Sequence, residues 1–287
     1  MDAVIYYFTS TGNSLAAARK IAEGIDAELI AIPSVADEQA VRPDAAAVGI
    51  VFPVYYASNE SGIPLIVQDF VRSLDVRDRY VFAVCTSGYT PGETMGNLRK
   101  LVQARGGRLS AGYVLNMSHK SLGRELQDKM KKPEGRGTIE ARDGASLDTK
   151  LEEIIQAVRK REEAKIETRS LWGRILNAPL RAVMKPVFKG RYKRLSQSKG
   201  LSFEEMIPLA DHSFQVRDTC AGCGMCARVC PVDNIGIAEG KPVWRHRCET
   251  CYACYQWCPE EAIYGEIVAY NDRYHHPDVT LVDMINR

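Results

Sequence analysis

The spacing of the cysteines constrains this chain more than any other feature of its sequence. The chain has nine cysteines, and eight of them form two runs with the spacing C-x2-C-x2-C-x3-C, each followed at once by proline. The first run consists of Cys220, Cys223, Cys226 and Cys230, and the second of Cys248, Cys251, Cys254 and Cys258. Because the second run starts 28 residues after the first, the segment reads as an internal duplication.

The sequence shows no segment that would direct the protein out of the cytoplasm. Its first residues, MDAVIYYFTSTGNS, lack the basic stretch and the small-residue cleavage site of a signal peptide. The longest uncharged run, 45–59, is broken by Pro53 and is too short to span a bilayer. We therefore expect a cytoplasmic protein, and in that reducing compartment clustered thiols favour metal binding over disulfides.

The two runs resemble those of bacterial ferredoxins, which hold 4Fe–4S clusters. In two-cluster ferredoxins the fourth cysteine of each run serves the other cluster, and the resemblance implies the same crossing here. The implied ligand sets are Cys220, Cys223, Cys226 and Cys258 for one cluster, and Cys248, Cys251, Cys254 and Cys230 for the other. A pair of zinc sites is the alternative, but zinc ribbons typically use C-x2-C pairs. The ninth cysteine, Cys85, lies in the apolar run YVFAVC and is expected to be a core residue.

The residues before the cysteine segment alternate between apolar runs and amphipathic stretches. Strands are expected at 3–8, 46–52, 80–85 and 108–116, and helices at 15–25, 64–74, 93–105 and 148–163. Such alternation predicts an α/β domain, in which helices cover both faces of a doubly wound parallel sheet.

The loop after the first expected strand offers hydroxyls, backbone N–H groups and the positive end of a helix. Its residues are Thr9, Ser10, Thr11, Gly12, Asn13 and Ser14. By itself the loop is equally consistent with a helix cap and with a phosphate site. Its position after strand one of an alternating α/β pattern favours the phosphate site.

TSTGNS resembles the phosphate loop of flavodoxins, which bind FMN. The resemblance implies a five-stranded sheet and two further loops that hold the isoalloxazine ring. Those loops contain Pro53, Val54, Tyr55, Tyr56 and Ala57 after strand three, and Thr86, Ser87, Gly88, Tyr89 and Gly92 after strand four. Of the three tyrosines we expect one to stack on the flavin and the others to pack beneath the loops. The polar stretch 117–146 is expected to be a mobile loop, and there the chain departs from flavodoxin relatives.

Between the two halves lies a strongly basic segment. Residues 168–200 contain nine lysines or arginines and no acidic residue, although the whole chain has a net charge of only +2. Apolar residues recur through this segment at helical spacing, with interruptions at Pro179 and Pro186. We expect the segment to dock on the protein's own domains or on a redox partner. A peripheral membrane contact is the alternative, and a nucleic-acid site is disfavoured because no nucleic-acid motif accompanies the charge.

The chain as a whole resembles the flavodoxin–ferredoxin fusion proteins of anaerobic bacteria and archaea. The resemblance implies three parts: a flavodoxin-like FMN domain at 1–165, a connector at 166–205, and a small α+β ferredoxin domain with two 4Fe–4S clusters at 206–287. It also implies an electron carrier whose partners are donor and acceptor oxidoreductases.

Two other functions stay open on the sequence. The flavin could itself reduce a quinone, a nitro compound or an enone, fed by the clusters, which would make the protein an enzyme. Alternatively the N-terminal domain could be a scaffold without flavin. No catalytic residue can be assigned, and the absence of a strand–GxGxxG–helix element argues against a built-in nicotinamide site. The sequence predicts no oligomeric state.

Overall fold

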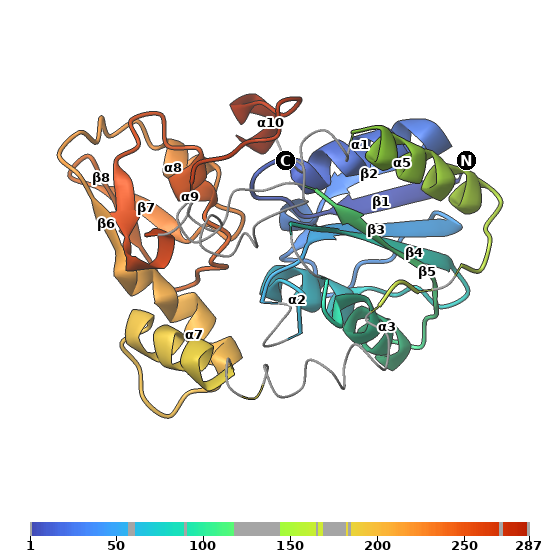
Figure 1. Cartoon of the computed structure of the whole chain (residues 1–287), viewed down its shortest axis with the longest axis horizontal. Coiled ribbons are helices and arrows are strands. Elements are labelled where there is room, and N and C mark those ends of the chain that lie inside the picture. The colour runs from blue at the N-terminus through green and yellow to red at the C-terminus, as the bar shows by residue number, and fades with distance from the viewer. Residues whose placement is uncertain are drawn as a thin grey trace, which may run out of the picture. The chain divides into compact units, whose positions relative to one another are not determined.

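The computed structural model describes residues 2–56, 61–88, 91–117, 144–164, 166–168, 182, 185–269 and 272–285. Described residues up to 168 belong to one compact unit and those from 182 onward to a second (Figure 1). The expected flavin-loop residues Ala57 and Tyr89 lie outside the described residues. So do most of the predicted loop 117–146 and the connector stretch 169–181.

The first unit is built on a five-stranded sheet in which every strand pair is parallel. Its strands are β1 (Ala3–Tyr7), β2 (Glu28–Ala31), β3 (Ala47–Pro53), β4 (Tyr80–Ser87) and β5 (Leu109–Asn116). They lie in the order β2-β1-β3-β4-β5, which is the flavodoxin-like doubly wound order. The predicted fold class is therefore confirmed. Sequence periodicity did not locate β2, a short edge strand with only Ala31 buried.

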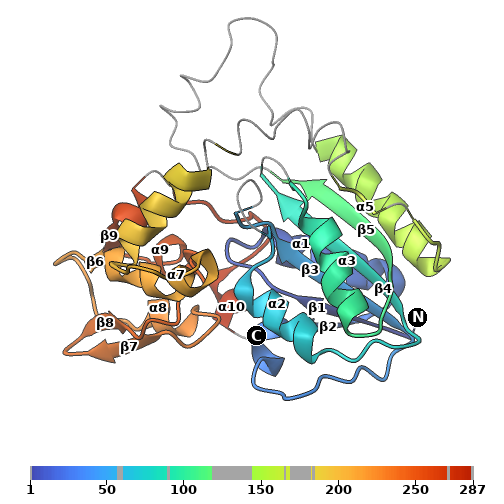
Figure 2. The same cartoon turned by 90° about the horizontal axis from the view of Figure 1, so that it is seen from below.

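Helices cover both faces of this sheet. They are α1 (Asn13–Ile25), the 3-10 helix η1 (Ile32–Val35), α2 (Leu65–Ser73), α3 (Thr94–Ala104) and α5 (Gly144–Arg159). Helices α1 and α5 pack together on one face, and α2 and α3 pack together on the other (Figures 1 and 2). Helix α1 buries Leu15, Ala18, Ile21 and Ile25, whose spacing of three to four residues forms one apolar stripe. The loops that follow the strands lie at the carboxyl ends of the strands, which these helices do not cover.

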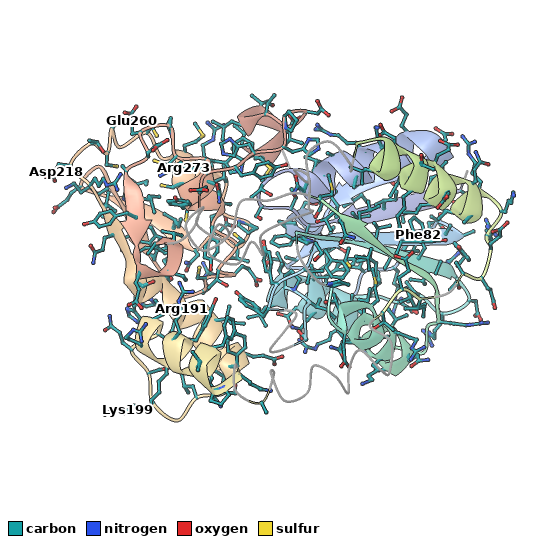
Figure 3. All side chains as sticks on the ribbon, in the orientation of Figure 1. Phe82, Arg191, Lys199, Asp218, Glu260 and Arg273 are labelled. Atoms are coloured by element: carbon teal, nitrogen blue, oxygen red, sulfur yellow. The ribbon has the colours of Figure 1, made fainter. Side chains whose placement is uncertain are left out.

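The core of the first unit is packed through the sheet. Ile5, Ile50 and Phe82 are fully buried, which explains why their strands read as continuous apolar runs in the sequence. Phe82, labelled in Figure 3, fills the space that a side chain at position 49 would need. A Cβ added to Gly49 would meet the Phe82 ring at 2.5 Å, so glycine is required there. Cys85 is fully buried, and burial raises the pKa of its thiol, so this cysteine is a core residue.

A short segment beyond α5 pairs with the free edge of β5. Ala164 N donates to Ser110 O at 3.1 Å, and Glu167 N donates to Gly112 O at 2.8 Å. The Glu167 carboxylate also accepts from Val114 N at 2.7 Å and pairs with Lys150 at 2.9 Å. Residues 166–168, which the sequence analysis placed in the connector, therefore still pair with the sheet.

The second unit contains two small antiparallel sheets. Its helices and strands are α7 (Phe203–Leu209), η3 (Ala210–Ser213), β6 (Phe214–Val216), α8 (Met225–Arg228), β7 (Ile235–Ala238), β8 (Lys241–Trp244), α9 (Ala253–Gln256), β9 (Ile263–Gly265), η4 (Glu266–Val268) and α10 (Leu281–Ile285). Strand β6 pairs with β9, and β7 pairs with β8. Val216 lies opposite Ile263, and Trp244 lies opposite Ile235. These two pairs correspond to each other under the 28-residue repeat, so the duplication seen in the sequence is also structural.

The described end of the connector packs on the second unit. Residues 185–195 are helical, and the Tyr192 ring lies 5.0 Å from Phe188 and 4.9 Å from Phe203 between ring centroids. Arg194 forms an ion pair with Glu266, and Arg191 donates to Glu266 O at 3.1 Å. The described end of the connector thus contacts other residues of its own chain. Within the described residues, no helix has the length and apolar character needed to cross a membrane.

Candidate cofactor sites

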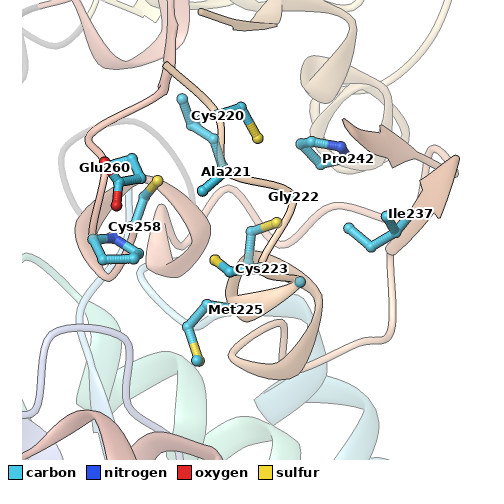
Figure 4. A pocket seen from close by; sticks show the side chains of 13 residues that line it. Cys220, Ala221, Gly222, Cys223, Met225, Ile237, Pro242, Cys258 and Glu260 are labelled. Atoms are coloured by element: carbon cyan, nitrogen blue, oxygen red, sulfur yellow. The ribbon is translucent and has the colours of Figure 1, made fainter. Parts of the chain in front are cut away.

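Cysteines from both runs surround one pocket of the second unit. Cys220, Cys223 and Cys226 line it from the first run, and Cys258 lines it from the second (Figure 4). The rest of the lining is mostly apolar and includes Ile237, Pro242 and Ile263. The pocket therefore brings together one ligand set that the crossed arrangement implies. Among the described residues, no three His, Cys, Asp or Glu side chains are grouped as they would be around a single metal ion.

The other four cysteines also influence one another. Burial raises the pKa of the Cys254 thiol well above its usual range, and Cys251 and Cys230 raise it further. The pKa of Cys248 is likewise raised well above its usual range, first by burial and then by Cys251 and Cys254. In the first set, burial raises the pKa of Cys226 to about 11, and the nearby Cys258, Cys223 and Cys220 contribute. Buried thiolates so close together need a compensating cation, which the iron of a cluster supplies, so both sets fit a 4Fe–4S cluster.

The two cysteine loops have the same backbone path. Left-handed residues recur at equivalent positions, with φ of 67° at Gly222 and 49° at Thr250, and 71° at Gly224 and 63° at Tyr252. The fourth cysteine of each run is the one assigned to the other run's cluster. Its sulfur accepts a hydrogen bond from the backbone N–H of the residue four positions later. Asn234 N lies 3.3 Å from Cys230 Sγ, and Ala262 N lies 3.4 Å from Cys258 Sγ. Hydrogen bonds to ligand sulfurs are one means by which proteins tune iron–sulfur clusters.

A buried carboxylate ties the segments around the second loop together. Asp211 has a fully buried side chain, and its Oδ2 accepts from Asn234 Nδ2 at 2.9 Å and from His246 N at 3.0 Å. Its Oδ1 lies 2.7 Å from His246 Nδ1. The Asn234 side chain in turn accepts from Arg247 N at 2.6 Å, just before Cys248. Nothing in the sequence marks Asp211, because it lies outside the cysteine runs.

We predict that Asp211→Ala destabilises the second unit by about 3 kcal/mol, because it leaves the buried Asn234 amide and two nitrogens of His246 without their acceptor. Urea denaturation followed at the iron–sulfur absorbance would show a lower midpoint than in the wild type. The midpoint of the flavin signal would stay unchanged. Asp218→Ala is the matched control, because the Asp218 side chain is fully exposed. Equal midpoints for the two variants would contradict the prediction.

The predicted phosphate loop lies at the carboxyl edge of the first unit's sheet. Thr9, Ser10, Asn13 and Ser14 are buried there, although all four are polar. Thr9 Oγ1 accepts from Gly12 N at 3.2 Å, and Gly12 has a left-handed φ of 97° just before α1 begins. The N-cap of α1 is Gly12, which has no side chain that could cap the helix. Buried hydroxyls beside a helix N-terminus suit a phosphate group.

The two predicted ring loops lie beside the phosphate loop where they are described. Ser14 Oγ and Thr86 Oγ1 are 2.8 Å apart, and Val54 N donates to Thr86 O at 2.9 Å. The structure thus brings together Thr9–Ser14, Pro53–Tyr56 and Thr86–Gly88 at one edge, as a flavin site requires. Gly92 follows with a left-handed φ of 58°.

The described tyrosines of the ring loops contact one another and the sheet. The Tyr55 ring packs edge-on against Phe8 at 6.2 Å and against Tyr56 at 5.9 Å between centroids. Tyr56 itself adopts a left-handed φ of 56°. Which tyrosine stacks on the flavin stays a prediction.

Comparison with known proteins gives a family match within the second unit. The family model described as 4Fe-4S dicluster domain matches residues 219–263. Curated protein sequences give no match.

Solved structures similar to the first unit include three flavodoxins. That of Fusobacterium nucleatum, bound to flavin mononucleotide, is 13% identical, covers 56% of this chain and 99% of its own, and has a TM-score of 0.37. Those of Streptococcus pneumoniae and Megasphaera elsdenii are 15% and 18% identical. Each covers 40% of this chain and 85% or 87% of its own, with TM-scores of 0.34 and 0.32.

The chain therefore joins a flavodoxin-like α/β unit, recognised by its strand order, to an iron–sulfur segment of the dicluster type. This is the arrangement of a flavodoxin–ferredoxin fusion, as the sequence predicted. The match to a 4Fe-4S dicluster domain supports a role in electron transfer.

Proposed function

We propose that this protein carries electrons between one FMN and two 4Fe–4S clusters and passes them to a partner oxidoreductase. The observation that carries the proposal is the pocket that takes cysteines from both runs, since a crossed set is expected of two linked clusters and not of separate zinc ribbons. The first cluster would be held by Cys220, Cys223, Cys226 and Cys258, and the second by Cys248, Cys251, Cys254 and Cys230.

The first unit would hold FMN through its three edge loops. The buried hydroxyls of Thr9, Ser10 and Ser14, together with the N-terminus of α1, would bind the phosphate. The loops at Pro53–Tyr56 and Thr86–Gly88 would flank the ring. When bound, FMN exchanges electrons in pairs or singly, whereas each cluster exchanges one at a time. Joining both in one chain raises their effective concentration toward each other.

The proposed partners are proteins that donate or accept single electrons in the cytoplasm. The described end of the connector supports a strap function, because Arg194 pairs with Glu266 and Arg191 donates to Glu266 O. Phe188 and Tyr192 also pack against Phe203, and Tyr192 is buried. A membrane role for this part would have to displace those contacts.

The function can be tested on the full chain purified without oxygen. Iron, sulfide and FMN are measured first, and the visible spectrum is then followed during addition of NADPH, a reduced ferredoxin or dithionite. Bleaching by reduced ferredoxin but not by NADPH alone would support the carrier. Rapid bleaching by NADPH alone would instead indicate a nicotinamide-dependent enzyme, and protein without FMN or iron would refute the proposal.

A further inference from the structure

At two positions around the second cysteine loop, the second half carries a side-chain donor that the equivalent position of the first half lacks. Under the 28-residue repeat, Trp244 corresponds to Val216, and Thr250 corresponds to Gly222. Both residues of the second half carry a side-chain hydrogen-bond donor, and neither residue of the first half does. The duplicated backbone thus has two additional donors around Cys248, Cys251 and Cys254.

The indole of Trp244 packs within the second unit, near a cysteine of the second set. Its ring stacks on Phe214, with 5.2 Å between centroids and 13° between planes. Nε1 is buried and makes no hydrogen bond within normal geometry to any described residue. The Trp244 side chain nevertheless lies close to Cys254.

The hydroxyl of Thr250 is the second such donor. Thr250 is only 3% exposed, and its Oγ1 is buried and has no hydrogen-bond partner among the described residues. Its backbone N donates to Cys248 Sγ at 3.2 Å, so the residue lies directly against the ligand sulfurs. Its φ of 49° is unfavourable for a β-branched residue, whereas the equivalent position is glycine. A strained residue with an unsatisfied hydroxyl costs stability, and a sulfur acceptor would offset part of that cost.

The second loop also has a negative charge that acts against the donors. The buried carboxylate of Asp211 lies close to Cys248. Negative charge near a cluster disfavours its reduction, whereas hydrogen bonds to its sulfurs favour it. The contribution of the donors must therefore be measured by removing them one at a time, and it cannot be read from the absolute potential.

We propose that Trp244 and Thr250 donate hydrogen bonds to sulfur atoms of the cluster held by Cys248, Cys251, Cys254 and Cys230, and thereby raise the reduction potential of that cluster alone. This inference rests on the proposed function, because it concerns one of the two clusters. It makes the duplicated clusters inequivalent, so an electron entering the unit meets two different sites. Both residues are tuning residues, since neither is a ligand.

The test is an anoxic redox titration of the full chain, followed by electron paramagnetic resonance. Trp244→Phe keeps the ring that stacks on Phe214 and removes the N–H, and Thr250→Val keeps the branched shape and removes the hydroxyl. Each variant is expected to retain its iron and to move one cluster step to a more negative potential, leaving the other cluster and the flavin unchanged. The cluster whose potential changes should be the cluster that the Cys226→Ala, Cys258→Ala double variant still contains.

Two further variants keep the test specific. Thr250→Ser keeps a hydroxyl at this position. The potential of its second cluster should therefore lie closer to the wild-type value than that of Thr250→Val. Val216→Ile changes packing at the position equivalent to Trp244 and should move neither step. Unshifted potentials in Trp244→Phe and Thr250→Val, or equal shifts of both clusters, would overturn this inference alone. A wild-type protein without two one-electron cluster steps would overturn the proposed function as well.

Discussion

The Cys226→Ala, Cys258→Ala double variant is expected to lose one cluster and keep the other, so that it retains roughly half of its iron. These two cysteines belong to different runs, but both line the same pocket. Removing two of its four thiolates abolishes the first cluster, because metal binding and local folding are coupled. The remaining set still has all four of its cysteines. Iron and sulfide analysis, together with the amplitude of the iron–sulfur absorbance, measures the result.

The matched control removes two cysteines of the same run. Cys226→Ala, Cys230→Ala should lose nearly all of its iron, because the crossed arrangement assigns these residues to different clusters. If each run instead held its own cluster, this variant would keep half and the first variant would lose everything. The pair therefore distinguishes the two arrangements by one measurement, and reversed iron contents would contradict the crossed assignment.

Gly12→Ala is expected to weaken FMN binding about tenfold, which corresponds to about 1.4 kcal/mol. Gly12 holds a φ of 97° between the buried hydroxyls of the phosphate loop and the start of α1. A residue with a Cβ disfavours the left-handed region by about 1–2 kcal/mol. Without FMN the loop can relax, so the strain returns on binding and is measured as lost affinity. Titration of the apoprotein with FMN, followed by flavin fluorescence, gives the dissociation constant.

Gly200→Ala is the control for backbone strain away from the loop. Gly200 also has a left-handed φ of 82°, and a Cβ there would have no heavy atom within 4 Å. This variant should therefore bind FMN as the wild type does. Unchanged affinity in Gly12→Ala would mean that the loop does not hold the phosphate.

Much of the fold could be predicted because its determinants are local. The strands β1, β3, β4 and β5 are buried on both faces, so each appears in the sequence as an apolar run. The edge strand β2 could not be located, because a half-exposed strand of four residues has no such pattern. The hydrogen bonds of Ala164 and Glu167 to β5 were also missed, since they depend on main-chain groups of Ser110 and Gly112 that carry no sequence signature.

The candidate sites were predictable to a different degree. The cysteine spacing and the TSTGNS loop were visible because their residues are close together in the chain. Asp211 was not, because its partners Asn234 and His246 lie 23 and 35 residues away. Thr250 could have been noticed, since the internal repeat aligns it with a glycine. That alignment alone does not show that its hydroxyl is buried.

The sequence by itself determined the two-part organisation, the alternating α/β pattern and the duplicated cysteine segment, because each is written in the order and spacing of neighbouring residues. Only the tertiary structure decided what surrounds the sites. It brought Cys258 to the pocket of the first run, paired Arg194 of the connector with Glu266, and stacked Trp244 on Phe214. These relations depend on packing between segments far apart in the chain, and spacing along the chain does not specify them.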